Sequence, residues 1–169
     1  IDIYDDKYIR KLDIKIAIIY RNYSEKHDKN LILRIKKTCK IDRRKFFIAN
    51  NLRLATNLSL DGVYLPSFNK NLSIMKTNMR KNFMIIGSAH SPQEIKIKEN
   101  QGATAIFISP LFKTEKNKGF LDTIKFNLLS LKTHQKIIAL GGITVKNLRR
   151  LKTTKSYGFS GISYFKDNN

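Results

Sequence analysis

The sequence is poor in cysteine, tryptophan and acidic residues. A single thiol, Cys39, excludes internal disulfides and cysteine-rich metal sites. No apolar run approaches the roughly 20 residues of a membrane-spanning helix, and the start, Ile1 to Asp6, lacks the basic-then-apolar order of a signal peptide. We therefore expect a cytoplasmic protein without a membrane partner, in which Cys39 is a buried or half-buried structural thiol.

The shortage of acidic residues leaves a formal charge of +20, from 33 Lys and Arg against 13 Asp and Glu. Lysine-rich surfaces gain affinity for phosphate backbones by releasing counterions, so this charge raises the question of a nucleic-acid partner. The basic residues, however, are spread from Lys7 to Lys166 and form no single stripe, and the chain is also rich in Asn and Ile. We expect weak adhesion to polyanions and no specific nucleic-acid partner.

Length and composition predict one domain over residues 1–169, because 41% apolar residues suffice for a sizeable core. Short apolar runs without polar alternation take turns with segments of helical periodicity, and each pair occupies roughly 20 to 30 residues. The expected strands are 14–20, 46–48, 62–65, 83–86, 103–109, 137–140 and 157–162, with the remains of another at 1–4, and the expected helices are 5–12, 25–40, 52–58, 72–80, 92–101, 122–131 and 145–151.

This alternation predicts an α/β protein whose buried parallel strands are joined by right-handed crossovers. Two architectures satisfy the pattern, a closed (β/α)8 barrel and an open doubly wound sheet. About eight strand signals, counting the one at 1–4, favour a (β/α)8 TIM barrel that is truncated at its N-terminus. In such a barrel the carboxyl ends of all strands lie on one rim, where binding and catalytic residues gather.

The run 137–140 stops at the glycine pair Gly141-Gly142. Amides at the carboxyl end of a strand, together with the N-terminus of the next helix, can hold an anion without a charged side chain. A plain tight βα turn is the alternative interpretation. The barrel favours the anion site, because phosphate is bound there at the loops after the last two strands, which here carry Gly141-Gly142 and Ile162-Ser163.

Two further segments of the expected rim carry polar residues. Thr114 and Lys116 lie on the long loop after strand 103–109, where they either close over the same anion or form a solvated loop. His90 ends the strand that begins at 83 and precedes a helix start marked by Ser91, Pro92 and Glu94. A neutral histidine beside a ligand can move protons, whereas one that packs on its own turn is structural.

Taken together, these segments resemble the thiamine phosphate synthase and TenI-type thiazole tautomerase family. The similarity is carried, in order and spacing, by Gly87 to Glu94, Gly102 to Thr114, Ile138 to Ile143 and Gly158 to Ser163. The resemblance implies a (β/α)8 barrel of thiamine biosynthesis. The synthase joins a hydroxymethylpyrimidine diphosphate to a thiazole phosphate with Mg²⁺, whereas the tautomerase isomerises a carboxythiazole phosphate without metal.

The resemblance also implies residue roles. It makes His90 and Ser88 the proton-transfer candidates, because they match a Ser-x-His of the family. The resemblance also implies that the carboxylates that bind Mg²⁺ in the family are missing here. The family's Asn-Asp corresponds to Asn50-Asn51 or, without a gap, to Ala49-Asn50, and a further aspartate corresponds to Asn69, so no Mg²⁺ carboxylate remains. The expected substrate-binding residues are Arg21, Asn50, Asn51, Thr114, Lys116, Gly141, Gly142, Ile162 and Ser163.

We therefore expect a thiamine-biosynthesis protein that binds a small-molecule thiazole phosphate, either as a metal-independent tautomerase or as a divergent synthase. No metal site is expected, and Mg²⁺ is a cofactor only if synthase activity is retained. The alternative is a catalytically inactive binding or regulatory barrel for a thiamine-related phosphorylated metabolite. A basic protein that adheres to nucleic acid is a third class. The sequence leaves the oligomeric state open.

Overall fold

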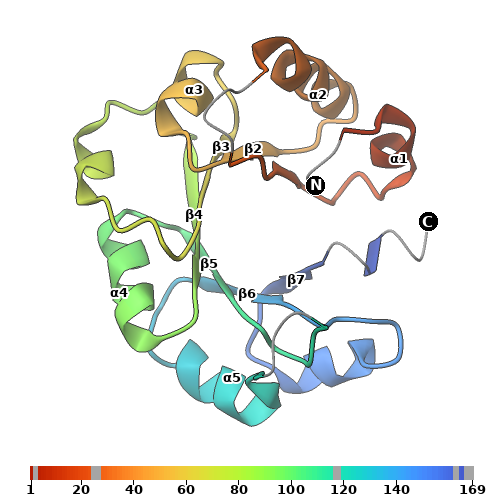
Figure 1. Cartoon of the computed structure of the whole chain (residues 1–169), viewed down its shortest axis with the longest axis vertical. Helices are drawn as coiled ribbons and strands as arrows, with labels where there is room; N and C mark the ends of the chain where they lie inside the picture. Colours follow the sequence, from red (N-terminus) through yellow and green to blue (C-terminus); the bar gives the residue numbers. More distant parts are fainter. Residues whose placement is uncertain (2–3, 24–27, 116–118, 162–163, 166–169) are drawn as a thin grey trace. The chain divides into compact units, whose positions relative to one another are not determined.

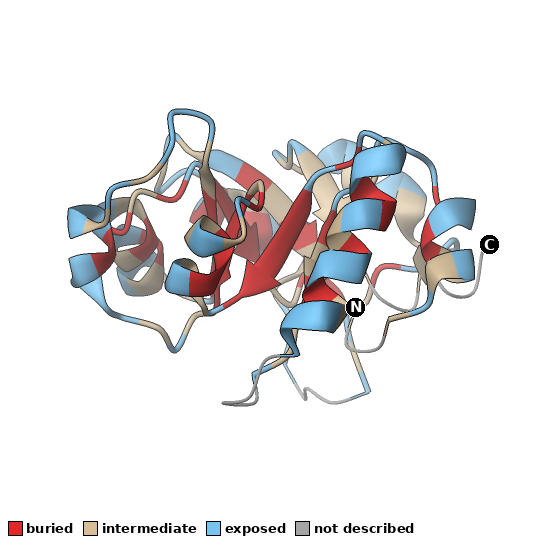
Figure 2. Ribbon diagram, turned by 90° about the horizontal axis from the view of Figure 1, so that it is seen from above, coloured by how far each residue is buried: buried red, intermediate tan, exposed pale blue. Residues whose placement is uncertain are grey.

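Strands and helices alternate along the chain, as the sequence predicts (Figure 1). This computed structural model describes residues 1, 4–23, 28–115, 119–161 and 164–165. Buried residues gather on the strands and on one side of the helices, and exposed residues cover the other side of the helices (Figure 2). Strands β2 (Phe46–Ala49), β3 (Gly62–Leu65) and β5 (Ala105–Ile108) are buried at every residue, which explains why their sequences lack polar alternation.

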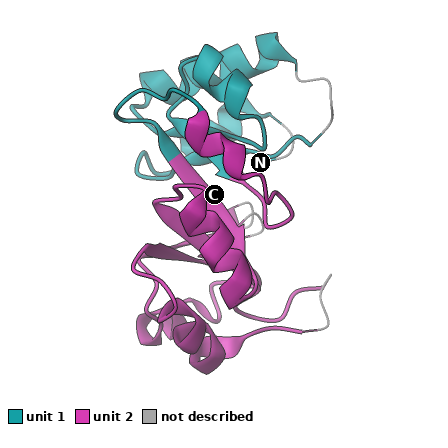
Figure 3. Ribbon diagram, turned by 90° about the vertical axis from the view of Figure 1, so that its left-hand side faces the viewer, with its two compact units in different colours: residues 1–64, 77–84, 169 teal, residues 65–76, 85–168 magenta. Residues whose placement is uncertain are grey.

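Contacts divide the chain into two compact units (Figure 3). The first comprises residues 1–64, 77–84 and 169, and the second comprises residues 65–76 and 85–168. The segment 65–76 follows the first unit in sequence but belongs to the second by its contacts.

In the first unit, parallel strands are joined through helices. Ile18 of the first strand lies beside Phe46 of the second, and Phe47 lies beside Gly62 of the third. Ile1 adds to this sheet: its amino group donates to the carbonyl of Ile19 over 2.6 Å, and its carbonyl accepts from the amide of Arg21 over 2.8 Å. The elements are α1 (Asp6–Lys11), β1 (Ile18–Tyr20), α2 (Lys29–Ile41), β2, α3 (Leu52–Asn57) and β3.

The second unit repeats the parallel arrangement. Ile86 pairs with Ala105, Ile106 with Ile137, and Ile138 with Gly158 in the register of its ladder. Each crossover between these strands is a helix or a single 3₁₀ segment. The elements are η1 (Leu72–Lys76), β4 (Met84–Ala89), α4 (Pro92–Asn100), β5, α5 (Asp122–Ser130), β6 (Lys136–Leu140), η2 (Leu148–Thr153) and β7 (Gly158–Ser160), with Met84 itself grouped in the first unit.

Two expected α-helices are short 3₁₀ segments instead. Where 72–80 was predicted, the structure has the shorter segment η1, which ends at Lys76. The side chains of Asn69 and Asn71 accept from the amides two residues on, which is turn bonding that competes with a regular helical start. Where 145–151 was predicted, η2 starts only at Leu148, because the Asn147 side chain binds the preceding turn.

The count of strands also differs from the prediction. The described residues form seven strands, whereas about eight were expected. Of the extra signal expected at 1–4, residues 2 and 3 lie outside the described ranges, and Ile1 forms hydrogen bonds with Ile19 and Arg21 beside β1. Cys39 is buried as expected, and burial raises the pKa of its thiol to about 12, so it stays protonated and inert. Within the described ranges, no helix is long and apolar enough to cross a membrane.

Candidate active site at the strand ends of the second unit

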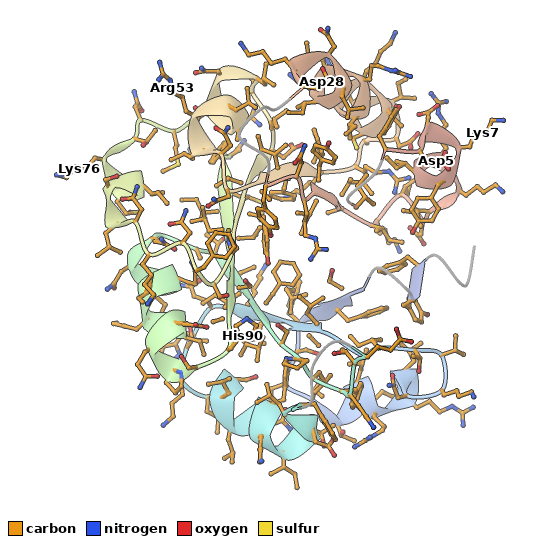
Figure 4. The ribbon with its side chains drawn as sticks, in the orientation of Figure 1. Asp5, Lys7, Asp28, Arg53, Lys76 and His90 are labelled. Atoms are coloured by element: carbon orange, nitrogen blue, oxygen red, sulfur yellow. The ribbon has the colours of Figure 1, made fainter. Side chains whose placement is uncertain are left out.

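The carboxyl ends of β4, β5 and β6 are joined by hydrogen bonds. The amide of Leu111 donates to the carbonyl of Leu140 over 2.8 Å, and the amide of Phe112 donates to Gly141 over 3.1 Å. His90, which is labelled in Figure 4, directly follows β4. Its Nδ1 atom lies 2.7 Å from the carbonyl oxygen of Ser109. These bonds hold one loop, from Ser109 to Lys113, between its two neighbouring strand ends.

The glycine pair after β6 is required by this loop. Gly141 and Gly142 both have positive φ, at 95° and 67°. A Cβ atom on Gly142 would lie 2.4 Å from the carbonyl oxygen of Lys113 and 2.6 Å from that of Phe112. Real Cβ atoms do not approach backbone so closely, so residue 142 must be glycine for the loop to lie where it does. The sequence indicated a turn but not this contact.

The same turn presents amide groups. In the described part of the chain, the N–H groups of Gly142 and Ile143 have no hydrogen-bond acceptor. The Asn147 side chain fixes the turn, donating to the carbonyl of Gly142 over 2.7 Å and accepting from the amide of Thr144 over 2.9 Å. Unpaired amides on a fixed glycine turn are suited to an anionic ligand.

His90 has a defined tautomer. A carbonyl oxygen can only accept, so the bond to Ser109 places the proton on Nδ1 and leaves Nε2 of the neutral ring as an acceptor. The imidazole is exposed, while the backbone N–H of His90 donates to the Glu94 carboxylate over 2.6 Å. Ser91 caps α4 as predicted, its Oγ accepting from the Glu94 amide over 3.3 Å. An exposed, oriented Nε2 can act as a general base.

The other predicted residues of this unit are placed as follows. Ser88 is buried in β4, two residues before His90. Thr114 is half-buried and follows Lys113, whose carbonyl packs on Gly142, so the glycine turn and Thr114 lie on adjoining segments. Lys116, Ile162 and Ser163 lie outside the described residues.

An arginine not anticipated from the sequence supports the loop after β5. The Arg150 guanidinium lies 4.9 Å from the centre of the Phe112 ring and forms an ion pair with Asp122. Its hydrogen bond holds the pKa of the Asp122 carboxyl below its usual range. Because Arg150 belongs to η2, the pairing fastens α5 and η2 to the same loop.

Three predicted residues belong to the first unit. Arg21 and Asn50 directly follow β1 and β2, and Asn50 has a positive φ of 59° while its amide donates to the carbonyl of Tyr64. Asn51 is the N-cap of α3, and its Oδ1 accepts from the Leu54 amide over 2.9 Å. The Asn51 side chain therefore already has a structural partner.

Asn69 lies in a network that the sequence did not indicate. Lys98 of α4 is fully buried, and its Nζ donates to the carbonyl of Pro66 over 2.7 Å, to that of Asn69 over 2.6 Å and to Gln101 Oε1 over 2.9 Å. Gln101 in turn donates to Asn69 Oδ1 and to the carbonyl of Asn71. Burial lowers the pKa of Lys98 to about 8, with Glu94 partly opposing the shift. We call residues 66–71 the β3 loop.

Comparison with known proteins agrees with this architecture. A family model described as thiamine monophosphate synthase, TMP-TENI, matches residues 11–165. A putative thiamine-phosphate synthase 2 of Aquifex aeolicus is 30% identical over 161 residues, which cover 93% of this chain and 80% of that protein. The thiamine-phosphate synthase of Helicobacter pylori is 30% identical over 141 residues, covering 80% of this chain and 62% of the relative.

A solved structure shares the fold. The thiamine phosphate pyrophosphorylase of Pyrococcus furiosus superposes with a TM-score of 0.68 and 21% identity, over 86% of this chain and 71% of that one. The fold is thus TIM-barrel-like, of the α/β class that the sequence predicted.

Proposed function

The chain belongs to the thiamine monophosphate synthase family, and from this premise we propose that it binds a thiazole phosphate at the strand ends of its second unit and isomerises a carboxythiazole phosphate without a metal ion. The observation that carries the proposal is the orientation of His90, whose Nδ1 is held by Ser109 while Nε2 remains an acceptor. Such a base can take a proton from a carbon of the bound heterocycle and return it elsewhere on the ring.

The glycine turn supports the phosphate end of the proposal. The unpaired amides of Gly142 and Ile143 suit an anion, and the neighbouring Thr114 hydroxyl can add a donor. Lys116, Ile162 and Ser163 are proposed to complete the phosphate site, and Ser88 to assist proton transfer. The binding roles expected for Arg21, Asn50 and Asn51, which belong to the first unit, stay predictions.

The residues that replace the family's metal carboxylates do not fit Mg²⁺. Oδ1 of Asn51 accepts from the Leu54 amide, and Oδ1 of Asn69 accepts from the Asn71 amide. Neutral amides offer no charge to offset the dehydration of a hard divalent cation. Within the described ranges, no three His, Cys, Asp or Glu side chains gather as a metal site. These features favour tautomerisation over the Mg²⁺-dependent synthase reaction.

The binding site can be tested by calorimetric titration of thiazole phosphate and of inorganic phosphate. Thr114→Val keeps the shape of the side chain but removes the hydroxyl, and we expect affinity for both ligands to fall about 5- to 20-fold. The matched control is Thr104→Val, which removes a hydroxyl just before the amino end of β5 and should leave affinity unchanged. Equal affinity in Thr114→Val and wild type would contradict the site.

The reaction can be tested separately by NMR of carboxythiazole phosphate incubated with the protein in EDTA. We expect isomerisation to proceed under these conditions. Binding without turnover would instead establish the inactive binding or regulatory barrel. Release of diphosphate from the two thiamine half-molecules, dependent on Mg²⁺, would establish a divergent synthase.

A further inference from the structure

The β3 loop is built around a cation supplied by the protein itself. Its carbonyl groups at Pro66 and Asn69 converge on the ammonium of Lys98, and Gln101 Oε1 provides the third acceptor. An ammonium has three N–H donors, so all of them are used and none remains for a ligand. Among the described residues no carboxylate forms an ion pair with Lys98.

A glycine in strand β4 leaves space for the Lys98 side chain. A Cβ atom on Gly87 of β4 would lie 2.7 Å from Cδ and 2.9 Å from Cγ of Lys98. The aliphatic stem therefore crosses β4 where the strand has no side chain. A fully buried lysine that forms no ion pair is costly, since its charge leaves water and Glu94 only partly opposes the effect of burial on its pKa. The packing of its stem and the use of all three donors indicate that the ammonium has a specific task.

We propose that Lys98 is a positioning residue whose ammonium orders the β3 loop, with Gln101, so that this loop needs no bound metal ion. Three oxygen acceptors around one positive charge form the kind of shell that a small cation would otherwise fill, and like-charge repulsion disfavours a second cation beside it. This proposal rests on the proposed metal-independent function and explains how the β3 loop can be ordered without a metal ion. Loops at the carboxyl ends of parallel strands carry binding residues, so the order of this loop matters for the site.

The order of the loop can be measured without substrate by amide hydrogen exchange. Three amides report on this loop. The amide of Asn69 donates to the carbonyl of Pro66 over 3.1 Å, that of Asn71 to Oδ1 of Asn69 over 2.9 Å, and that of Ser73 to Oδ1 of Asn71 over 2.9 Å. In Lys98→Met, which keeps an unbranched stem but lacks the terminal ammonium, we expect exchange of these amides to accelerate at least about tenfold. The matched control is Lys96→Met on the same helix, where the side chain is 72% exposed, and it should exchange as the wild type does.

Two additions make the test specific to a cation. Propylammonium should restore slow exchange to Lys98→Ala, because it supplies the three carbons and the charge that are missing. EDTA or Mg²⁺ should leave wild-type exchange unchanged. Equal exchange in the Lys98 and Lys96 variants, failure of propylammonium, or slower wild-type exchange with Mg²⁺ would each overturn the proposal.

Two further outcomes can be distinguished from a failure of this proposal: misfolding of the Lys98 variant and failure of the proposed function. If Lys98→Met does not fold, Gln101→Leu breaks the same junction from its second residue and should also release the three amides. If the wild type fails to bind thiazole phosphate, the proposed function fails while the exchange results still decide the role of Lys98.

Discussion

At the scale of single residues, hydrogen bonds decide which groups remain available for chemistry. The bond from His90 Nδ1 to Ser109 leaves Nε2 as the accepting nitrogen, and the bonds of Lys98 leave its ammonium without a free donor. Two basic side chains of the second unit thus differ in kind: the exposed one can exchange protons with a ligand, and the buried one cannot.

His90→Ala should lower kcat for tautomerisation by about 10²- to 10⁴-fold, the range for loss of a general base. Affinity for inorganic phosphate should change by less than about twofold, because the glycine turn does not depend on the imidazole. The measurements are NMR turnover and calorimetry, with His134→Ala, another exposed histidine, as the control. Full turnover in His90→Ala would rule out the proton-transfer role.

Lys98 should make the free energy of unfolding rise with pH. Burial lowers its folded-state pKa from 10.5 to about 8, so between these values the unfolded chain binds more protons than the folded chain. Stability therefore increases as pH rises through this window, by on the order of 2 kcal/mol between about pH 7 and about pH 10.

Urea unfolding of wild type and Lys98→Met at both pH values isolates this contribution, because the other lysines titrate alike in the two proteins. The stability of the wild type relative to Lys98→Met should be greater at the higher pH. If the difference in the free energy of unfolding between the two proteins does not vary with pH, the pKa of Lys98 is not lowered on folding, because its three acceptors offset the effect of burial.

At the scale of elements, the loop after β5 and the turn after β6 determine each other's shape. Phe112 donates to Gly141, the carbonyls of Phe112 and Lys113 lie against Gly142, and Arg150 stacks on Phe112. A side chain at position 142 would therefore alter the loop as well as any anion bound to the turn. For this reason the Thr114 hydroxyl is the cleaner test of the anion site.

Gly142→Ala should lower the free energy of unfolding by at least about 2 kcal/mol, because the new Cβ meets backbone oxygens and the residue keeps a positive φ. The matched control is Gly119→Ala, since a Cβ at Gly119 meets no atom within 4 Å. Both variants can be compared by urea unfolding. Equal stability of the two variants would show that the loop can move away from the turn without cost.

At the scale of the whole molecule, we expect the charge of +20 to act as a dispersed field, because the basic residues are spread along the sequence. We expect weak binding to duplex DNA or RNA that falls at least about tenfold between about 50 mM and about 200 mM salt, because such binding is driven by counterion release. Fluorescence anisotropy with duplexes of different sequence would measure it. Tight binding that prefers one sequence at physiological salt would contradict this expectation.

The sequence by itself determined the order and type of most elements and the family. The buried strands β2, β3 and β5 appear as uninterrupted apolar runs, and the start of α4 is marked by Ser91, Pro92 and Glu94, because burial and capping act over a few neighbouring residues. The sequence also predicted that His90, Thr114 and the glycine pair follow strand ends, and Ser88 was added from the resemblance to the family; the roles of these residues in a site stay predictions. The closed eight-stranded barrel and the thiazole phosphate site stay predictions.

Only the tertiary structure decided what holds these strand ends. Lys98 reaches a carbonyl 32 residues earlier in the chain, and Gly142 is fixed as glycine by carbonyls of the preceding strand's loop. Neither pairing has a local sequence pattern, since a buried lysine on a helix reads like any solvated lysine. The physical reason is that backbone carbonyls, present at every residue, are the partners in both contacts, and only the folded chain selects which carbonyls converge.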